Sequence, residues 1–138
     1  MSKEAGLACW IIPTEGGNLL VPDNLVAEVV VLEDSDTQQH ISWRNRSVPI
    51  YQNEINDKIT TRVVVLRAVM GYQGLPFIAV AVDGIPHALQ VTPDALSEVE
   101  TPEAQCKVAA SYTRVGSLDC VIPDLPKIEN LLRERVAA

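Results

Sequence analysis

The fold class follows from residues 62–82, which read RVVVLRAVMGYQGLPFIAVAV. Both ends of this stretch, residues 62–69 and 77–82, are rich in valine and other aliphatic residues. Such β-branched side chains are stiff and pack well on a pleated sheet. The glycine-containing segment between them, residues 71–74, has the composition of a turn. The stretch therefore predicts two consecutive strands joined by a turn.

Short apolar runs and turns continue outward from this stretch to both ends of the chain. Only the C-terminus predicts a helix, because Asp124 can cap it and Pro126 is tolerated in the first turn. Pro49 cannot donate a ladder hydrogen bond, so we expect it at a sheet edge or a bulge. Many short strands predict a mostly β fold of small closed barrels, in a single domain spanning residues 1–138. One helical turn is predicted after Thr92. The apolar residues of the C-terminal helix are Ile128, Leu131, Leu132 and Val136. The other predicted strands are residues 7–12, 19–21, 26–32, 48–51, 85–91, 107–112 and 118–122.

Composition excludes several classes of partner. The net charge is −7 and the sequence pI is about 4.7, and no cluster of lysine or arginine provides the basic face that binds nucleic acid or an anionic membrane. No apolar stretch is long enough for a signal peptide or a membrane-spanning helix. The three cysteines, Cys9, Cys106 and Cys120, lack the paired spacing of a zinc or redox motif. We therefore expect a cytoplasmic protein with reduced thiols and a protein partner.

No catalytic, metal or cofactor site is predicted. The two histidines, His40 and His87, are isolated in sequence, and no glycine-rich phosphate loop is present. Cys9 and Cys120 lie in apolar runs where a thiol is inert, whereas Cys106 has a more polar setting. An enzyme that uses Cys106 or His87 is the least favoured hypothesis. A small-ligand-binding barrel that senses a metabolite ranks above it, and requires a roomy cavity with convergent polar groups.

Glu28 is the one unusual residue in an apolar strand, because it interrupts residues 26–31, which otherwise favour burial. A carboxylate there costs several kcal/mol, by order of magnitude, unless it stays at the surface or has a partner. Arg44 is a plausible partner, since a guanidinium pairs with a carboxylate in a fixed fork. In the alternative interpretation, Glu28 is a charge that protects an edge strand and Arg44 is merely solvated.

Four segments, in order along the chain, resemble the CheW-type coupling domains of bacterial chemotaxis. Residues 20–29 resemble the Val-x-Glu-Val/Ile element that follows the second strand of the family. Residues 43–50, with Arg44 and Pro49, resemble its Arg-Gly-x-x-x-Pro-Ile/Leu/Val element. Residues 78–92 resemble its Val-Asp-x-Val segment, and residues 118–132 are similar to its final strand and terminal helix. The resemblance covers nearly the whole chain.

This resemblance implies two intertwined five-stranded SH3-like β-barrels around a shared core, with a C-terminal helix. It also implies a non-catalytic adaptor that binds the regulatory domain of a CheA-type histidine kinase and the signalling tip of a chemoreceptor. By the same resemblance, Glu28 and Arg44 lie near a functional interface. Val26 and the Asp83-Gly84-Ile85 stretch are expected to line the groove between the barrels that takes the receptor.

Two departures from the family pattern are visible. A compact acidic segment ending at His40 replaces a longer segment with a short helix, and Asn45 stands where the family has glycine after the arginine. Residues 10–17 and Glu54 are more similar to the ChpC-type branch, which serves chemosensory systems that control type IV pili and twitching motility.

Overall fold

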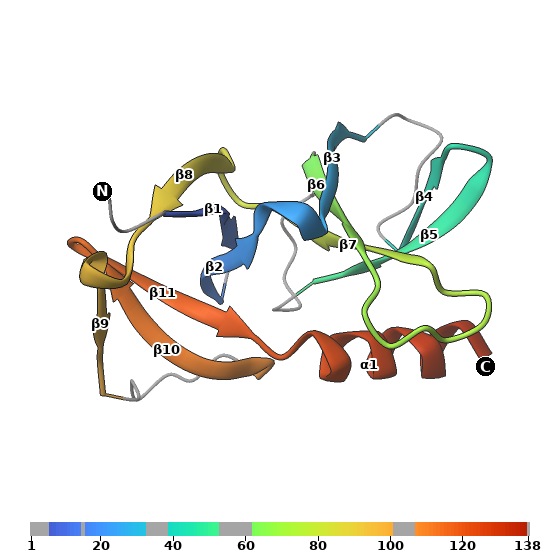
Figure 1. Cartoon of the computed structure of the whole chain (residues 1–138). Coiled ribbons are helices and arrows are strands. Elements are labelled where there is room, and N and C mark those ends of the chain that lie inside the picture. The colour runs from blue at the N-terminus through green and yellow to red at the C-terminus, as the bar shows by residue number, and fades with distance from the viewer. Residues whose placement is uncertain (1–5, 15, 33–38, 53–61, 101–106, 138) are drawn as a thin grey trace.

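The computed structural model describes residues 6–14, 16–32, 39–52, 62–100 and 107–137. These residues form two curled β-sheets, side by side, and one C-terminal helix (Figure 1). The chain begins in the first sheet, builds the second sheet, and then returns to complete the first. The predicted mostly β fold with two interleaved units and a terminal helix is confirmed.

The first sheet has six strands in the order β8-β1-β2-β11-β10-β9. β1 and β2 form the predicted antiparallel N-terminal hairpin, and β11 joins β2 in parallel at Val121 and Leu19. The resemblance implied five strands, and the additional one is the three-residue β9, which pairs with the end of β10. The 3₁₀ turn η2 (Pro93–Ala95), predicted after Thr92, leads into β9. The strands are β1 (Leu7–Thr14), β2 (Gly17–Pro22), β8 (His87–Val91), β9 (Leu96–Glu98), β10 (Ala109–Val115) and β11 (Leu118–Pro123).

The second sheet has five strands in the order β3-β6-β7-β5-β4, and the chain enters it through the 3₁₀ turn η1 (Asp23–Leu25). Its central β6–β7 pair is the pair of strands predicted from residues 62–82. β6 is buried on both faces, because Val63 and Val65 pack in one apolar cluster while Val64 and Leu66 pack in another. A strand buried on both faces reads as a continuous apolar run without alternation. The strands are β3 (Val26–Val31), β4 (His40–Trp43), β5 (Arg46–Tyr51), β6 (Arg62–Arg67) and β7 (Phe77–Ala81).

One apolar cluster joins the two sheets and the helix. It takes Ile12 and Leu19 from the first sheet, Leu66 and Ile78 from the second, and Ile128 from the helix, each at most 1% exposed. The two sheets therefore share this cluster, while a smaller one around Ile11 and Leu20 belongs to the first sheet alone. A second cluster, around Trp43 and Ile50, fills the other face of the second sheet.

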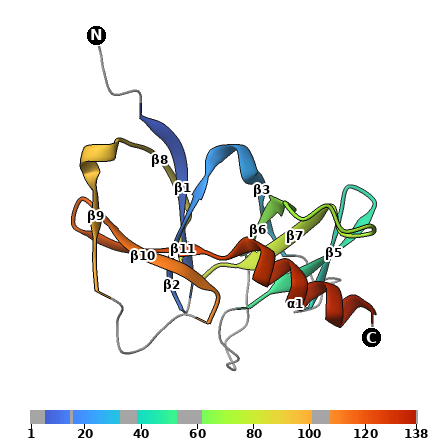
Figure 2. The ribbon, with the colours of Figure 1, turned by 60° about the horizontal axis from the view of Figure 1, so that its bottom comes forward.

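The helix α1 (Leu125–Ala137) starts where the sequence predicts, since the carboxylate of Asp124 accepts a hydrogen bond from the backbone N–H of Lys127 at 3.1 Å. α1 leaves β11 and runs along the second sheet (Figure 2). Arg135 donates from Nη2 to the backbone carbonyl of Ile50 in β5 at 2.8 Å. Ile128 and Leu132 are buried as predicted, whereas Leu131 is 44% exposed and does not belong to the packed face.

Pro49 lies in an inner strand, so the expectation of a sheet edge is wrong. β5 has β4 on one side and β7 on the other. Pro49 is opposite His40 in β4, and pairing with β7 begins at the next residue, Ile50. Pro49 therefore lies at the point where β5 stops pairing with β4 and begins pairing with β7. The absence of its backbone N–H is tolerated at such a point of the ladder.

Candidate functional site

Glu28 and Arg44 are in contact. Arg44 Nη2 lies 3.7 Å from Glu28 Oε1, and the two side chains are 65% and 49% exposed, so this solvated ion pair contributes less than about 1 kcal/mol. The same carboxylate oxygen accepts a hydrogen bond from Trp43 Nε1 at 3.1 Å. The Arg44 guanidinium lies 4.4 Å from the centroid of the Trp43 ring. Glu28 lies on the edge strand β3, as the alternative interpretation expects, but Arg44 is its ion-pair partner and not merely solvated.

A break in the ladder of β3 directs Glu28 toward Trp43. Val26 is opposite Leu66 and Glu28 is opposite Val65, so Ala27 is an extra residue in β3. In a regular strand Val26, Glu28 and Val30 would share one face. Here Val26 packs against the cluster that joins the sheets, whereas Val30 packs against the Trp43 cluster. A bulge of this kind re-aims a side chain, and it places Glu28 on the face that carries Trp43.

Arg44 and Asn45 form a two-residue turn between β4 and β5, because Trp43 and Arg46 are paired across it. Both turn residues have positive φ, 49° for Arg44 and 61° for Asn45. Positive φ at both central residues is the requirement of a type I′ hairpin turn, which favours Asn-Gly. Asn45 suits its position, because asparagine tolerates the left-handed region. Arg44 does not, since a left-handed conformation costs roughly 1–2 kcal/mol for an ordinary residue.

The hairpin packs on the start of β7 through aromatic contacts. Trp43 meets Phe77, the single phenylalanine of the chain, edge to face with ring centroids 4.8 Å apart. The Arg46 guanidinium lies 5.7 Å from the centroid of the same Phe77 ring. Trp43 is only 6% exposed, so the aromatic pair fixes the hairpin to the sheet while both arginines stay at the surface.

The other predicted interface residues lie at two separate places. Val26 is at the start of β3, where its carbonyl accepts a hydrogen bond from Arg67 Nη1 at 3.2 Å. The carbonyl of Gly84 accepts one from Arg62 Nη1 at 3.1 Å, at the far end of β6. Val26 and Gly84 are therefore at opposite ends of the β3–β6 ladder, whose end residues Leu66 and Arg62 are roughly 13 Å apart by the rise of a strand. Next to Gly84, Ile85 is 75% exposed and Asp83 is at the surface.

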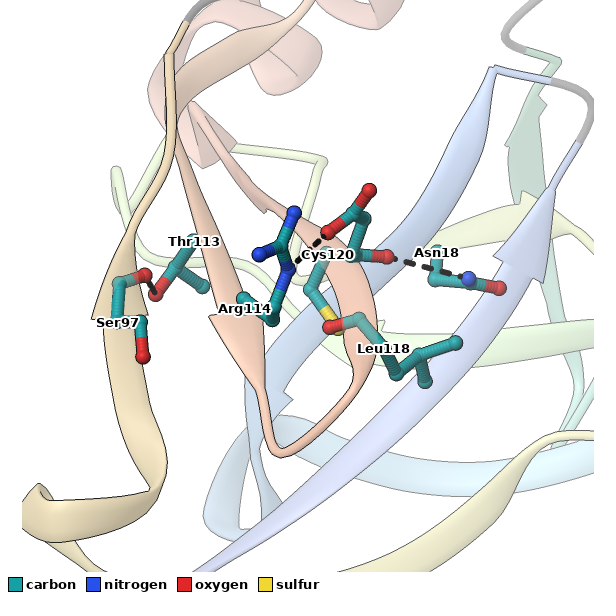
Figure 3. Close-up of polar contacts among 7 residues, drawn as sticks. Asn18, Ser97, Thr113, Arg114, Leu118 and Cys120 are labelled. Atoms are coloured by element: carbon teal, nitrogen blue, oxygen red, sulfur yellow. Dashed lines mark hydrogen bonds and ion pairs between the residues drawn. The ribbon is translucent and has the colours of Figure 1, made fainter.

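A hollow of about 660 Å³ opens in the first sheet, beside the β1–β2 and β10–β11 turns. Its volume is in the range of small-ligand sites. Two of its polar side chains already donate to Asp119 in β11, since Arg114 Nε donates to the Asp119 carboxylate at 2.6 Å and Asn18 donates to the Asp119 carbonyl at 3.3 Å (Figure 3). The ligand-sensor hypothesis requires convergent polar groups that are free to bind, and these two are not. The hollow is lined by Gly16, Gly17, Asn18, Val99, Glu100, Tyr112, Arg114, Asp119, Cys120 and Val121.

The described thiols are buried. Cys9 and Cys120 are 4% and 2% exposed, and burial raises the pKa of both thiols, as do the negative charges of Asp23 near Cys9 and Asp119 near Cys120. Cys106, the third candidate, is outside the described residues. Within the described ranges, no group of three or more His, Cys, Asp or Glu side chains is placed to hold a metal ion.

The comparisons with known proteins bear on the fold. The crystal structure of the scaffolding protein TtCheW from Thermoanaerobacter tengcongensis superposes with a TM-score of 0.58, over 86% of this chain and 88% of that chain. The chain has a CheW-like fold. Sequence identity to TtCheW is 10%, and no family model and no curated protein matches the chain. No described helix is both long and apolar enough to span a membrane.

Sequence reasoning missed three parts of the site that the CheW-like fold assembles. They are the bulge at Ala27, the Trp43–Phe77 contact and the position of Arg46 over Phe77. The low aromatic content, 4%, was a usable signal, because a rare aromatic residue at the start of a predicted strand is a candidate for a specific contact. The bulge left no signal, since residues 26–32 are almost uniformly apolar.

Proposed function

We propose that this chain is a non-catalytic coupling adaptor of a bacterial chemosensory pathway. It binds the regulatory domain of a CheA-type histidine kinase and the signalling tip of a chemoreceptor in the cytoplasm, and needs no cofactor. The fold shared with a scaffolding protein supports the adaptor role. The similarity of residues 10–17 to the ChpC-type branch supports a pathway that controls type IV pili and twitching motility.

The conformation of Arg44 carries this proposal. Its φ of 49° is unfavourable for arginine, and its only ion pair among the described residues is the 3.7 Å contact with Glu28. The turn itself does not require an arginine, because asparagine or glycine would form it with less backbone strain. Backbone strain at an exposed side chain is characteristic of sites kept for function. We therefore assign Arg44, positioned by Glu28 and Trp43, to the partner interface.

The exposed loop that follows β7 provides the second contact. Ile85 is the most exposed of the large apolar side chains in the described chain, at 75%, and it adjoins Gly84, which is tied to Arg62. An exposed apolar side chain on an anchored backbone is suited to insertion into a partner. Because Val26 lies at the other end of β3, we propose that the receptor contacts both ends of the β3–β6 ladder.

The test is binding of the purified chain to the CheA-type regulatory domain and the chemoreceptor tip from its own source. The variant Arg44→Asn keeps a residue that suits the turn and removes the guanidinium. We expect binding about tenfold weaker, because a charge-assisted contact is lost, while folding stability rises by about 0.5–1 kcal/mol. The matched control is Arg114→Gln, which removes an exposed arginine from the first sheet.

Two results would count against the proposal, at different levels. Equal binding by Arg44→Asn and the wild-type chain would remove Arg44 from the interface. Failure of the folded wild-type chain to bind either partner would overturn the adaptor function itself.

A further inference from the structure

β5 and β7 separate before they pair, and leave a notch in the second sheet. Their parallel ladder covers only Ile50 opposite Ala79 and Tyr51 opposite Val80. Toward their N-terminal ends the strands enclose a hollow of about 240 Å³. The notch is lined by Arg46, Ser47, Val48, Gly74, Pro76 and Phe77.

Arg46 is the one charged residue of this lining, and its guanidinium has no acidic partner in the described chain. Four other arginines of the described chain donate to a carbonyl or carboxylate: Arg62, Arg67, Arg114 and Arg135. Within the described part of the chain, the Arg46 guanidinium contacts only the Phe77 ring. That contact restrains the guanidinium over the notch without using its N–H donors, which leaves them available to a partner.

The dimensions and chemistry of the notch restrict its occupant. A hollow of about 240 Å³ is smaller than the roughly 300–1,000 Å³ of small-molecule sites, so it suits a single side chain. Val48, Pro76 and Phe77 provide apolar walls, and Arg46 provides a cationic rim. A glutamate side chain matches both, because its methylene stem is apolar and its carboxylate pairs with a guanidinium.

We propose that the notch between β5 and β7 binds a glutamate side chain from an extended segment of a protein partner, with Arg46 holding its carboxylate. Charge complementarity favours such a segment, because Arg44 and Arg46 extend from one hairpin and, among the described residues, only Glu28 pairs with either. That the segment belongs to the kinase or the receptor rests on the proposed function, since the same hairpin carries Arg44. The preference for a carboxylate does not depend on it.

The test uses the full chain labelled with ¹⁵N and a peptide of sequence Gly-Val-Glu-Val-Gly, capped at both ends so that its side chain is the only carboxylate. We expect this peptide to shift the Arg46 Nε–H signal and the backbone amide signals of Ser47 and Gly74. The capped glutamine counterpart should leave them in place. Arg46→Gln should weaken binding of the glutamate peptide about tenfold, because the charge-assisted bond is lost. Arg133→Gln is the matched control, since Arg133 also lies over an aromatic ring, that of Tyr72, and does not line the notch.

A third peptide has glutamine in place of glutamate and a free C-terminus. Three results would overturn the proposal: equal shifts from the capped glutamate and glutamine peptides, equal affinity in Arg46→Gln and wild type, or shifts from the third peptide alone. The last would assign the notch to a terminal carboxylate. Because this titration contains no kinase or receptor, it can fail while the adaptor function stands. It can equally succeed when neither partner binds the chain.

Discussion

The carboxylate of Glu129 accepts a hydrogen bond from the backbone N–H of Val69, at 2.7 Å, across sixty residues of sequence. Its other oxygen accepts one from the N–H of Met70 at 2.9 Å, and the Glu129 side chain is completely buried. One side chain of α1 thus satisfies two backbone donors just beyond β6. Val69 and Met70 remain 47% and 44% exposed, so Glu129 holds two apolar side chains at the surface.

Replacing Glu129 tests this clamp. Glu129→Ala removes both acceptors and leaves two part-buried N–H groups without this partner, so we expect a loss of about 2 kcal/mol in the free energy of unfolding, measured with urea. Amide hydrogen exchange at Val69 and Met70 should accelerate more than exchange in β6. Glu134→Ala on the exposed side of α1 is the control and should change stability by less than about 0.5 kcal/mol. A wild-type exchange rate at Met70 in Glu129→Ala would contradict the clamp.

Trp43, rather than Arg44, should be the main energetic partner of Glu28. The hydrogen bond from Trp43 Nε1 is part-buried, whereas the ion pair with Arg44 is longer and largely exposed. In double-mutant cycles on unfolding, we expect Glu28→Gln to couple to Trp43→Phe by about 1 kcal/mol and to Arg44→Asn by less than about 0.5 kcal/mol. Trp43→Phe keeps an aromatic ring against Phe77, so the hairpin should remain folded. A larger coupling to Arg44 would reverse this order.

The two buried cysteines should make stability depend on pH in the alkaline range. Burial raises the pKa of Cys9 and Cys120 in the folded chain, so the folded state holds these protons more tightly than the unfolded state. Their contribution is complete below the unfolded thiol pKa of about 8.5 and is lost as pH rises through the higher folded values. The urea midpoint should fall between pH 8 and pH 10, and less so in Cys9→Ala/Cys120→Ala. An equal fall in both proteins would assign the effect to other groups.

Side-chain chemistry read from the sequence offered Arg44 as a partner of Glu28 but could not determine the geometry of their contact. Residues 26–31 predict a strand containing an unusual carboxylate, and that strand is β3. The extra residue Ala27 decides which face of β3 Glu28 occupies. The sequence of this strand is almost uniformly apolar, so it does not reveal that the face changes there. Its hydrogen bond with Trp43 joins β3 to β4, which lie at opposite edges of the second sheet, so no local pattern could predict it.

By itself, the sequence determined the local structure: valine-rich strands, glycine turns and a capped C-terminal helix, because these follow from backbone propensity and hydrophobic patterning. Tertiary structure alone decided what required distant segments to meet: the inner place of Pro49, the sixth strand β9, the Glu129 clamp and the notch beside Arg46. Each of these features brings together residues that are distant in sequence. Hydrophobic periodicity along the chain does not predict which distant residues meet. β9 arises from its pairing with β10, and the others arise from the parallel pairing of β5 with β7 and from α1 lying along the second sheet. Local patterning specifies the elements, and their packing creates the surfaces to which we assign the proposed contacts.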